Sequence, residues 1–240
     1  MKLKIPYVDA HCHVYGLSIE RLKKITTNTI IVGVAEDLDS SKKVIEISKQ
    51  INNVIPMIGI HPWNVAKISY KELQDVVALL KDAKGFGEIG LDGKTKSFEK
   101  QVDFFERFLE VASEYDVPVN IHSRAAWREV IDLLFKYEIK KAILHWYSGP
   151  KEFLKDLEVQ GYMITINPSV IFQQKHQKIL ETAPLSMILT ESDGPYQYRG
   201  KYLTPAEIPS LVAFIAKVKQ TAQKRVRRTI FENLKKYFSI

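Results

Sequence analysis

The chain has 240 residues, of which 45% are hydrophobic and 26% are charged, with one cysteine and a formal net charge of +7. This is enough apolar material for one large core. No apolar run reaches the roughly 20 residues that span a bilayer, and ionisable residues interrupt the N-terminal stretch that a signal peptide would need. One cysteine excludes an internal disulfide framework. We therefore expect a single domain over residues 1–240, cytoplasmic and without a membrane partner.

The excess positive charge lies at the C-terminal end of the sequence. Residues 201–240 contain nine lysines and arginines against two acids, so the whole net charge of +7 comes from this segment. A basic segment can attract a polyanion such as nucleic acid. It can equally be the solvated face of a helix. The sequence leaves both interpretations open.

Short β-branched runs alternate with amphipathic helical patterns along the chain. The runs predict strands over residues 6–9, 29–35, 54–60, 85–89, 117–121, 141–144, 162–166 and 187–190. The helical patterns predict helices over residues 41–51, 69–81, 97–115, 125–137, 152–160, 176–182 and 205–219. This alternation favours an α/β fold of the (β/α)₈ TIM-barrel type. The strand patterns alone also fit a doubly wound open sheet.

Ionisable side chains gather at the C-terminal ends of the predicted strands. Five of the six histidines lie there, together with a glutamate and an aspartate; the full set is His11, His13, His61, Glu88, His122, His145 and Asp193. Barrel strands point their C-terminal ends at one common face, so these side chains are expected to converge although they are spread along most of the chain. This placement favours the barrel over the open sheet.

The chemistry of this set is typical of a catalytic metal site. Residues i and i+2 of a strand share a face, so His11 and His13 can hold one ion while Cys12 points away as a small core side chain. Histidines with carboxylates and an open position suit catalytic divalent ions. One strand-end histidine alone is more often a structural residue, and the prediction depends on the whole set. His176 lies outside the pattern and is predicted to be a surface helix residue.

Six blocks of the sequence resemble the TatD-like hydrolases of the amidohydrolase superfamily. They are residues 9–13 (DAHCH), 59–63 (GIHPW), 87–92 (GEIGLD), 118–124 (PVNIHSR), 145–149 (HWYSG) and 191–196 (ESDGPY). A closing segment from Thr229 to Phe238 is similar to the C-terminal pattern of that family. Together the blocks run the length of the chain in the family's order.

The resemblance implies a role for each matching residue. It implies two divalent ions, Mg²⁺, Mn²⁺ or Zn²⁺, with Glu88 bridging them. The remaining ligands would be His11, His13 and Asp193 for one ion and His122 and His145 for the other. It further implies that Asp193 accepts a proton from the attacking water, that His61 and Arg124 contact the substrate, and that Asp92 orients a ligand histidine.

The resemblance also implies an activity and leaves alternatives. The leading hypothesis is hydrolysis of DNA phosphodiester bonds by a deoxyribonuclease of this type. The alternatives are an ester or amide hydrolase, such as one that removes D-amino acids from transfer RNA, and a non-catalytic nucleic-acid-binding barrel. Three departures from the family pattern bear on the substrate and leave the expected ligands unchanged: Gly93 in place of an aromatic residue, Trp146-Tyr147 in place of Cys-Phe, and Leu203 in place of Asn.

Overall fold

Eight parallel strands follow one another around a ring in the computed structural model, which describes residues 5–240. Neighbouring strands pair in chain order from β1 to β3 and from β4 to β8. Their bounds are β1 (Tyr7–Cys12), β2 (Thr29–Gly33), β3 (Val54–Pro56), β4 (Phe86–Asp92), β5 (Val119–Arg124), β6 (Ala142–Leu144), β7 (Met163–Ile166) and β8 (Ile188–Thr190).

Two seams close this ring, where regular strand pairing gives way to individual hydrogen bonds and an isolated bridge between Ile58 and Phe86. Between β3 and β4, the amide of Gly87 donates to the carbonyl of Ile58 at 2.7 Å. Between β8 and β1, the Thr190 hydroxyl donates to the carbonyl of Val8 at 2.6 Å. Contacts on both sides leave no open sheet edge among β1 to β8. The predicted (β/α)₈ barrel is therefore confirmed, and the open-sheet alternative is wrong.

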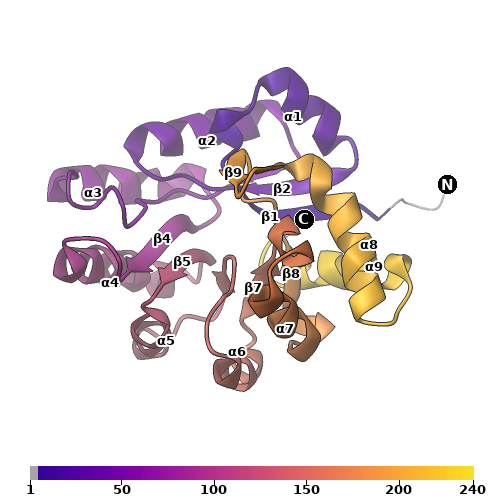
Figure 1. Ribbon diagram of the computed structural model, residues 1–240. Helices are drawn as coiled ribbons and strands as arrows, with labels where there is room; N and C mark the ends of the chain where they lie inside the picture. Colours follow the sequence, from indigo (N-terminus) through magenta and orange to yellow (C-terminus); the bar gives the residue numbers. More distant parts are fainter. Residues whose placement is uncertain (1–4) are drawn as a thin grey trace.

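Helices surround the strands on the outside of the ring, and each of α1 to α7 follows the strand of the same number (Figure 1). Two further helices follow β8. The bounds are α1 (Ile19–Thr26), α2 (Leu38–Gln50), α3 (Tyr70–Ala78), α4 (Phe98–Glu114), α5 (Trp127–Lys136), α6 (Leu154–Val159), α7 (Gln174–Thr182), α8 (Ile208–Val218) and α9 (Gln223–Lys235). No helix within residues 5–240 is long and apolar enough to cross a membrane.

The core forms because strand side chains alternate between two sides. In β2, Ile30 and Val32 belong to the main hydrophobic cluster. Ile31 belongs to a second cluster, where it packs with residues of α1 and α2 such as Leu22 and Val44. Successive strand residues point to opposite faces, so a fully apolar strand can contribute side chains to both hydrophobic clusters.

The start of α2 shows how a cap sets an element boundary. The Asp37 carboxylate accepts a hydrogen bond from the Ser40 amide at 2.8 Å, and the Ser40 hydroxyl accepts one from the Asp37 amide at 3.0 Å. This capping box satisfies two amides at the helix N-terminus. The helix therefore begins at Leu38, whereas apolar periodicity alone placed its start at residue 41.

Three elements were not predicted from the sequence. Helices α1 and α9 bury only narrow stripes among many charged residues; in α9 the stripe is Val226, Ile230 and Leu234, spaced four residues apart. The third is an antiparallel hairpin of β9 (Tyr196–Tyr198) and β10 (Lys201–Leu203). Its strands are three residues long, too short for an alternation pattern to be recognised.

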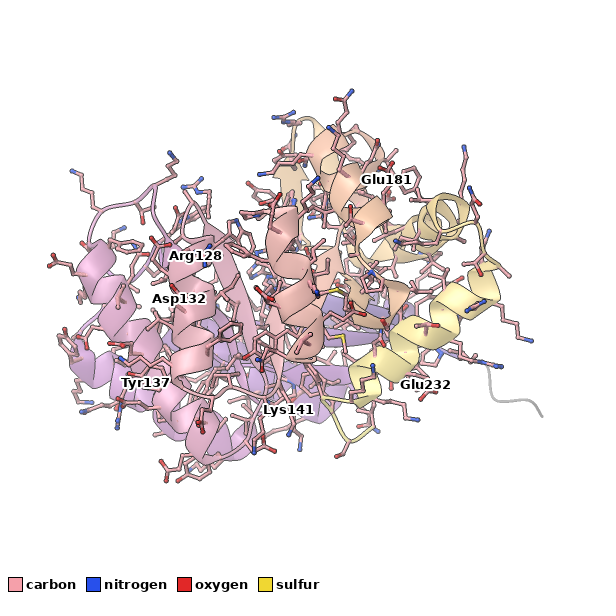
Figure 2. All side chains as sticks on the ribbon, turned by 90° about the horizontal axis from the view of Figure 1, so that it is seen from below. Arg128, Asp132, Tyr137, Lys141, Glu181 and Glu232 are labelled. Carbon is pink, nitrogen blue, oxygen red and sulfur yellow. The ribbon has the colours of Figure 1, made fainter. Side chains whose placement is uncertain are left out.

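The two ends of the barrel are distinguished in Figure 2, where the strands and helices are seen from the side. Arg128, at the start of α5, lies above Tyr137, which follows the end of that helix, and Lys141, just before β6, lies low in the view. The face where strands end and helices begin is therefore at the top of this picture. All the predicted site residues belong to that face.

Helix α9 and the residues after it cover the opposite face. The Asn233 side chain donates to the carbonyl of Ile188, the first residue of β8, at 2.9 Å. The Tyr237 hydroxyl donates to the carbonyl of Gly161, just before β7, at 2.7 Å. Arg227 lies 3.7 Å above the ring of Tyr7, at the start of β1. Helix α9 and the residues after it thus cover the N-terminal ends of β1, β7 and β8.

Candidate metal centre

The seven predicted residues come together at the C-terminal face of the barrel. One cleft of about 540 Å³ opens on that face, and six of the seven line it: His13, His61, Glu88, His122, His145 and Asp193. His11 is completely buried, and its Nε2 atom lies 3.3 Å from a Glu88 oxygen. Residues from six strands or the loops that follow them therefore meet at one point.

Glu88 lies at the centre of this set, and its two oxygens face different histidines. Oε1 lies 2.9 Å from Nδ1 of His122 and 3.3 Å from Nε2 of His145. Oε2 lies 3.3 Å from Nε2 of His11 and 3.5 Å from Nε2 of His13. The carboxylate therefore joins two groups of imidazoles, one on each oxygen.

Asp193 completes the group that contains His11 and His13. Its Oδ1 atom lies 3.5 Å from Nε2 of His11 and 3.4 Å from Nε2 of His13. The backbone of Asp193 is left-handed, with φ of 55°, a conformation that aspartate tolerates better than most residues. Its amide donates to the carbonyl of His11 at 3.0 Å, which fixes the loop after β8 against β1.

A hydrogen bond with the side chain of Asn120 sets the tautomer of His11. The Asn120 amide nitrogen donates to the carbonyl of Ala10 at 2.8 Å, so its oxygen faces Nδ1 of His11, also at 2.8 Å. Nδ1 must then donate, which leaves a lone pair on Nε2. That Nε2 is buried and has no hydrogen-bond partner within residues 5–240. A buried lone pair beside two carboxylates is the arrangement that a bound cation requires.

His145 and His13 are oriented in the same way by acidic residues. Nδ1 of His145 lies 3.3 Å from Oε2 of Glu191, a fully buried carboxylate. Nδ1 of His13 lies 3.2 Å from the hydroxyl of Tyr15, which itself donates to Glu36. Both contacts place the ring proton on Nδ1 and direct Nε2 to the centre. This carboxylate–histidine pattern is typical of metal ligands.

His122 approaches the centre through its other nitrogen. Its Nδ1 faces Glu88, and its Nε2 lies 3.5 Å from Oδ2 of Asp92. Asp92 is completely buried and also accepts from the Arg124 Nε atom at 2.9 Å. The interpretation of Asp92 as a residue that orients a histidine agrees with this geometry.

His61 differs from the other four histidines of the centre. The amide of Trp63 donates to its Nδ1 at 3.1 Å, so a neutral His61 carries its proton on Nε2. Burial lowers the pKa of His61 and favours this neutral form. Its Nε2 lies close enough to Glu88 and His122 to share an ion with them, but it offers a hydrogen there in place of a lone pair. In this tautomer Nε2–H points to Oε1 of Glu88, 3.2 Å away, and has no lone pair for an ion.

The two carboxylates are held ionised, and the pKa values of three ligand histidines, His13, His122 and His145, are raised. Burial would raise the pKa of Glu88, but the surrounding histidines keep it well below its usual range. The pKa of Asp193 is also lowered, by His13 and its neighbours, against the effect of burial. Burial opposes protonation of His13, yet Asp193 and Glu88 raise its pKa to about 9. Protons thus occupy positions that a cation could take.

The donor set fits divalent ions. Two ligands that each lie about 2.1 Å from one ion at a tetrahedral angle are about 3.4 Å apart. The contacts of His11 and His13 with Glu88 and Asp193 measure 3.3 to 3.5 Å. The second group, His122 and His145 on the other Glu88 oxygen, offers two nitrogens and one oxygen. Mixed nitrogen and carboxylate donors accommodate Zn²⁺ or Mn²⁺, and also Mg²⁺ where water completes the shell.

Sequence reasoning missed the residues that orient these histidines. Asn120 and Glu191 lie within the recognised blocks, yet they were given no role, and Tyr15 and Glu36 lie outside them. The available signal was chemical, because an acid or amide inside an apolar strand is costly without a partner. Glu191 directly follows β8 and is fully buried.

One residue prediction was wrong. His176 was expected on a helix surface, but its side chain on α7 is 1% exposed. Burial lowers its pKa to about 4, so it is neutral at physiological pH. The sequence around it is polar, and only the packing of α7 against the barrel reveals the buried face. Cys12 is a buried core residue as predicted.

Comparison with known proteins identifies the family. A family model described as TatD related DNase matches residues 8–239. The chain belongs to this family. It is 31% identical to an uncharacterised metal-dependent hydrolase of Methanocaldococcus jannaschii, over 98% of this chain and 97% of that protein. It is 28% identical to the human deoxyribonuclease TATDN3, over 96% of this chain and 94% of the human protein.

Solved structures of the TatD family share the fold. The TatD homologue YjjV of Escherichia coli superimposes with a TM-score of 0.90 at 20% identity, covering 99% of this chain and 100% of that one. A TatD-family hydrolase of Entamoeba histolytica gives a TM-score of 0.84 at 17% identity, covering 98% and 99%. At these identities the likeness establishes the barrel and no more.

Within this TatD-family chain, the three departures from the family pattern occupy different surroundings. Leu203 is fully buried, and Tyr147 is a core residue whose hydroxyl donates to the carbonyl of Pro150 at 2.6 Å. A side chain at Gly93 would approach the carbonyl of Ala125 to 2.8 Å. Only Trp146 among them lines the cleft. It is therefore the departure that can contact a substrate directly.

Proposed function

We propose that this chain is a divalent-metal-dependent hydrolase that cleaves phosphodiester bonds of DNA. The observation that carries the proposal is the position of Glu88, whose Oε2 faces His11 and His13 while its Oε1 faces His122 and His145, with His61 beside them. The family match and the relatives named as metal-dependent hydrolases and deoxyribonucleases support it.

In this proposal the centre holds two ions. His11, His13, Glu88 and Asp193 would hold one, and Glu88, His122 and His145 the other. Ions at such positions polarise a phosphoryl oxygen and lower the pKa of a water molecule. Asn120 and Glu191 accept hydrogen bonds from the Nδ1 atoms of His11 and His145 and hold these rings in place, so little reorganisation is needed when a substrate enters.

Three residues would act on the substrate directly. Asp193 is ionised and lines the cleft, so it can accept the proton that an attacking water loses. His61 lines the cleft with Nε2–H 3.2 Å from Glu88, and would donate that hydrogen to a phosphoryl oxygen once ions occupy the Glu88 oxygens. Arg124 uses Nε to bind Asp92, and its planar guanidinium has further donors for a non-bridging oxygen.

The basic C-terminal segment takes no part in this proposal. Its helix α9 covers the N-terminal ends of the strands, whereas the cleft opens at their C-terminal ends. Substrate charge would instead be met by residues at the cleft, Arg124 among them. A cytoplasmic location and a single-domain organisation, expected from the sequence, stay predictions.

The test is cleavage of single-stranded DNA labelled at one end, with Mg²⁺, Mn²⁺ and Zn²⁺ supplied in turn. A metal-dependent ladder that is absent in Asp193→Asn would support the proposal and give the direction of cleavage. If protein with demonstrated bound metal leaves DNA intact, the phosphodiester assignment is wrong. An aminoacylated transfer RNA would then be the next substrate, because the same centre could act on a carboxyl ester. DNA binding without turnover under every metal would support the non-catalytic alternative.

A further inference from the structure

The backbone at Trp146 turns its side chain into the same cleft as the histidine before it. His145 and Trp146 both line the cleft, although consecutive residues of an extended strand point to opposite sides. The cause is the left-handed conformation of Trp146, with φ of 41°. A bulky residue rarely adopts this conformation because it is strained. The Trp146 amide is fixed there by Thr165 Oγ1 at 2.7 Å and Glu191 Oε1 at 2.9 Å.

Trp146 belongs to a group of four aromatic rings beside the metal centre. Its ring centroid lies 6.4 Å from that of His145 and 5.0 Å from that of Tyr198. Tyr196 and Tyr198 are nearly parallel, with centroids 6.3 Å apart. Phe172, after β7, is nearly parallel to Tyr198, also at 6.3 Å. We call these four residues the aromatic wall.

The aromatic wall is accessible, and a cation lies against it. Tyr196 and Phe172 are 41% and 43% exposed, and Trp146, Tyr196 and Tyr198 line the cleft that contains the metal centre. The guanidinium of Arg199, at the turn of the β9–β10 hairpin, lies 5.5 Å above the ring of Tyr198. The hairpin therefore presents two flat rings in the cleft, with a positive charge against the ring of Tyr198.

We propose that the aromatic wall is a stacking subsite for an unpaired nucleobase next to the scissile phosphate, with Trp146 as its main contact. This inference rests on the proposed action on DNA. Flat aromatic faces with an adjacent cation are the combination that binds single-stranded nucleic acid, because every base offers a π-face and every nucleotide a phosphate. A base inside a duplex has both faces covered, so this subsite selects single-stranded or frayed ends.

The variants that test this subsite are chosen to suit the left-handed backbone conformation of residue 146. Trp146→Asn removes the ring, and asparagine suits a left-handed conformation, so the loop is expected to keep its shape. Trp146→Phe retains a ring and serves as the matched control. Both are measured on a single-stranded oligonucleotide with natural bases and on one with an abasic residue at each end.

The expected result is that loss of the base and loss of the ring have the same effect. The unaltered protein should show a KM about tenfold higher for the abasic oligonucleotide, a size typical of one stacked base. In Trp146→Asn the natural and abasic oligonucleotides should behave alike, whereas Trp146→Phe should still distinguish them. Equal KM values for both oligonucleotides in the unaltered protein would overturn the inference while leaving the hydrolase assignment intact.

A binding measurement separates failure of the subsite from failure of the proposed function. An oligonucleotide with terminal 2-aminopurine is titrated with Asp193→Asn protein and with the Asp193→Asn, Trp146→Asn double variant. Stacking on Trp146 predicts quenching of 2-aminopurine fluorescence in the first and little in the second, whether or not DNA is cleaved. Equal quenching in both would overturn the role of Trp146. Quenching that depends on Trp146 in a protein that cleaves no DNA would uphold the subsite and reject the deoxyribonuclease activity.

Discussion

At the scale of single residues, the centre is a balance of buried charges. Two carboxylates, Glu88 and Asp193, stay ionised against the effect of burial because histidines with raised pKa values, His13 and His145 among them, lie beside them. Binding of divalent ions would replace those protons, since a histidine must give up a proton to become a ligand. Proton release and metal binding are therefore expected to be coupled.

This coupling predicts that metal affinity rises with pH. Below its pKa of about 9, His13 is mostly protonated, so each lower pH unit should weaken binding by up to about tenfold for this proton alone. Isothermal titration in buffers of different ionisation enthalpy, between pH 6.5 and 8.5, measures both the affinity and the protons released. An affinity that is constant over this range would contradict the proposed role of His13.

Glu191, whose carboxylate lies beside Nδ1 of His145, gives a second prediction. Glu191→Gln keeps the size of the side chain and removes the charge that orients His145. Metal affinity is expected to fall by about 10- to 100-fold, the usual effect of losing such a partner. Glu158→Gln, an exposed change on α6, is the matched control. Unchanged metal affinity in Glu191→Gln would show that Glu191 has a purely structural role.

The sequence predicted the ligand candidates but missed the residues that hold them. His11, His61 and Glu88 could be recognised because strand ends of a barrel share one face. Asn120 and Glu191 act across neighbouring strands, and their contacts exist only once the strands are in register. Such contacts leave no spacing pattern in the chain, so only the structure reveals them.

At the scale of elements, the pairing of β4 with β5 leaves no room for a side chain at Gly90, beside the centre. Gly90 has φ of 137°, and a Cβ atom there would lie 2.0 Å from the carbonyl oxygen of His122. Only glycine combines this conformation with so close a contact. The position of His122 therefore depends on the absence of a side chain on the neighbouring strand.

This contact predicts that Gly90→Ala destabilises the fold and displaces His122. The expected loss is at least about 2 kcal/mol in the free energy of unfolding, because clash and backbone strain add together. Gly161→Ala is the matched control: its φ is also positive at 75°, but nothing lies within 4 Å of the added atom. Urea denaturation of both variants measures the difference. Equal losses would mean that the close approach has no energetic importance.

The parts of the fold that could be predicted are those marked by one clear sequence pattern. Apolar runs located all eight strands, and the barrel followed from the polar residues that end them. Helices α1 and α9 were missed because charged residues obscure their narrow apolar stripes. The hairpin of β9 and β10 was missed because its exposed rings have no core to alternate against. Yet this hairpin supplies two rings of the aromatic wall.

At the scale of the whole molecule, the basic residues of α9 and the candidate metal centre lie at opposite ends of the barrel. The C-terminal basic residues on α9 lie with the N-terminal ends of the strands, far from the cleft. Net charge alone therefore misidentifies the face that meets a polyanion. The solvated-helix interpretation of that segment agrees better with its position.

This arrangement predicts different effects for two sets of charge changes. Replacing the exposed residues Lys224, Arg225 and Arg228 of α9 by glutamine should leave kcat/KM for DNA and its salt dependence nearly unchanged. Arg124→Gln at the cleft should lower kcat/KM by about tenfold or more, as expected for a lost charge-assisted contact. Cleavage rates over a range of salt concentrations provide the measurement. A larger effect from the α9 changes would place the DNA on the other face.

If Glu88 joins two ion positions, its loss must lower the number of metal ions bound per chain. Protein loaded with Mn²⁺ or Zn²⁺ and passed through a desalting column would be analysed for bound metal beside Glu88→Gln, with folding verified by circular dichroism. We expect close to two ions per chain in the unaltered protein and fewer than one in the variant. A folded Glu88→Gln protein that retains its full metal content would contradict this role of Glu88.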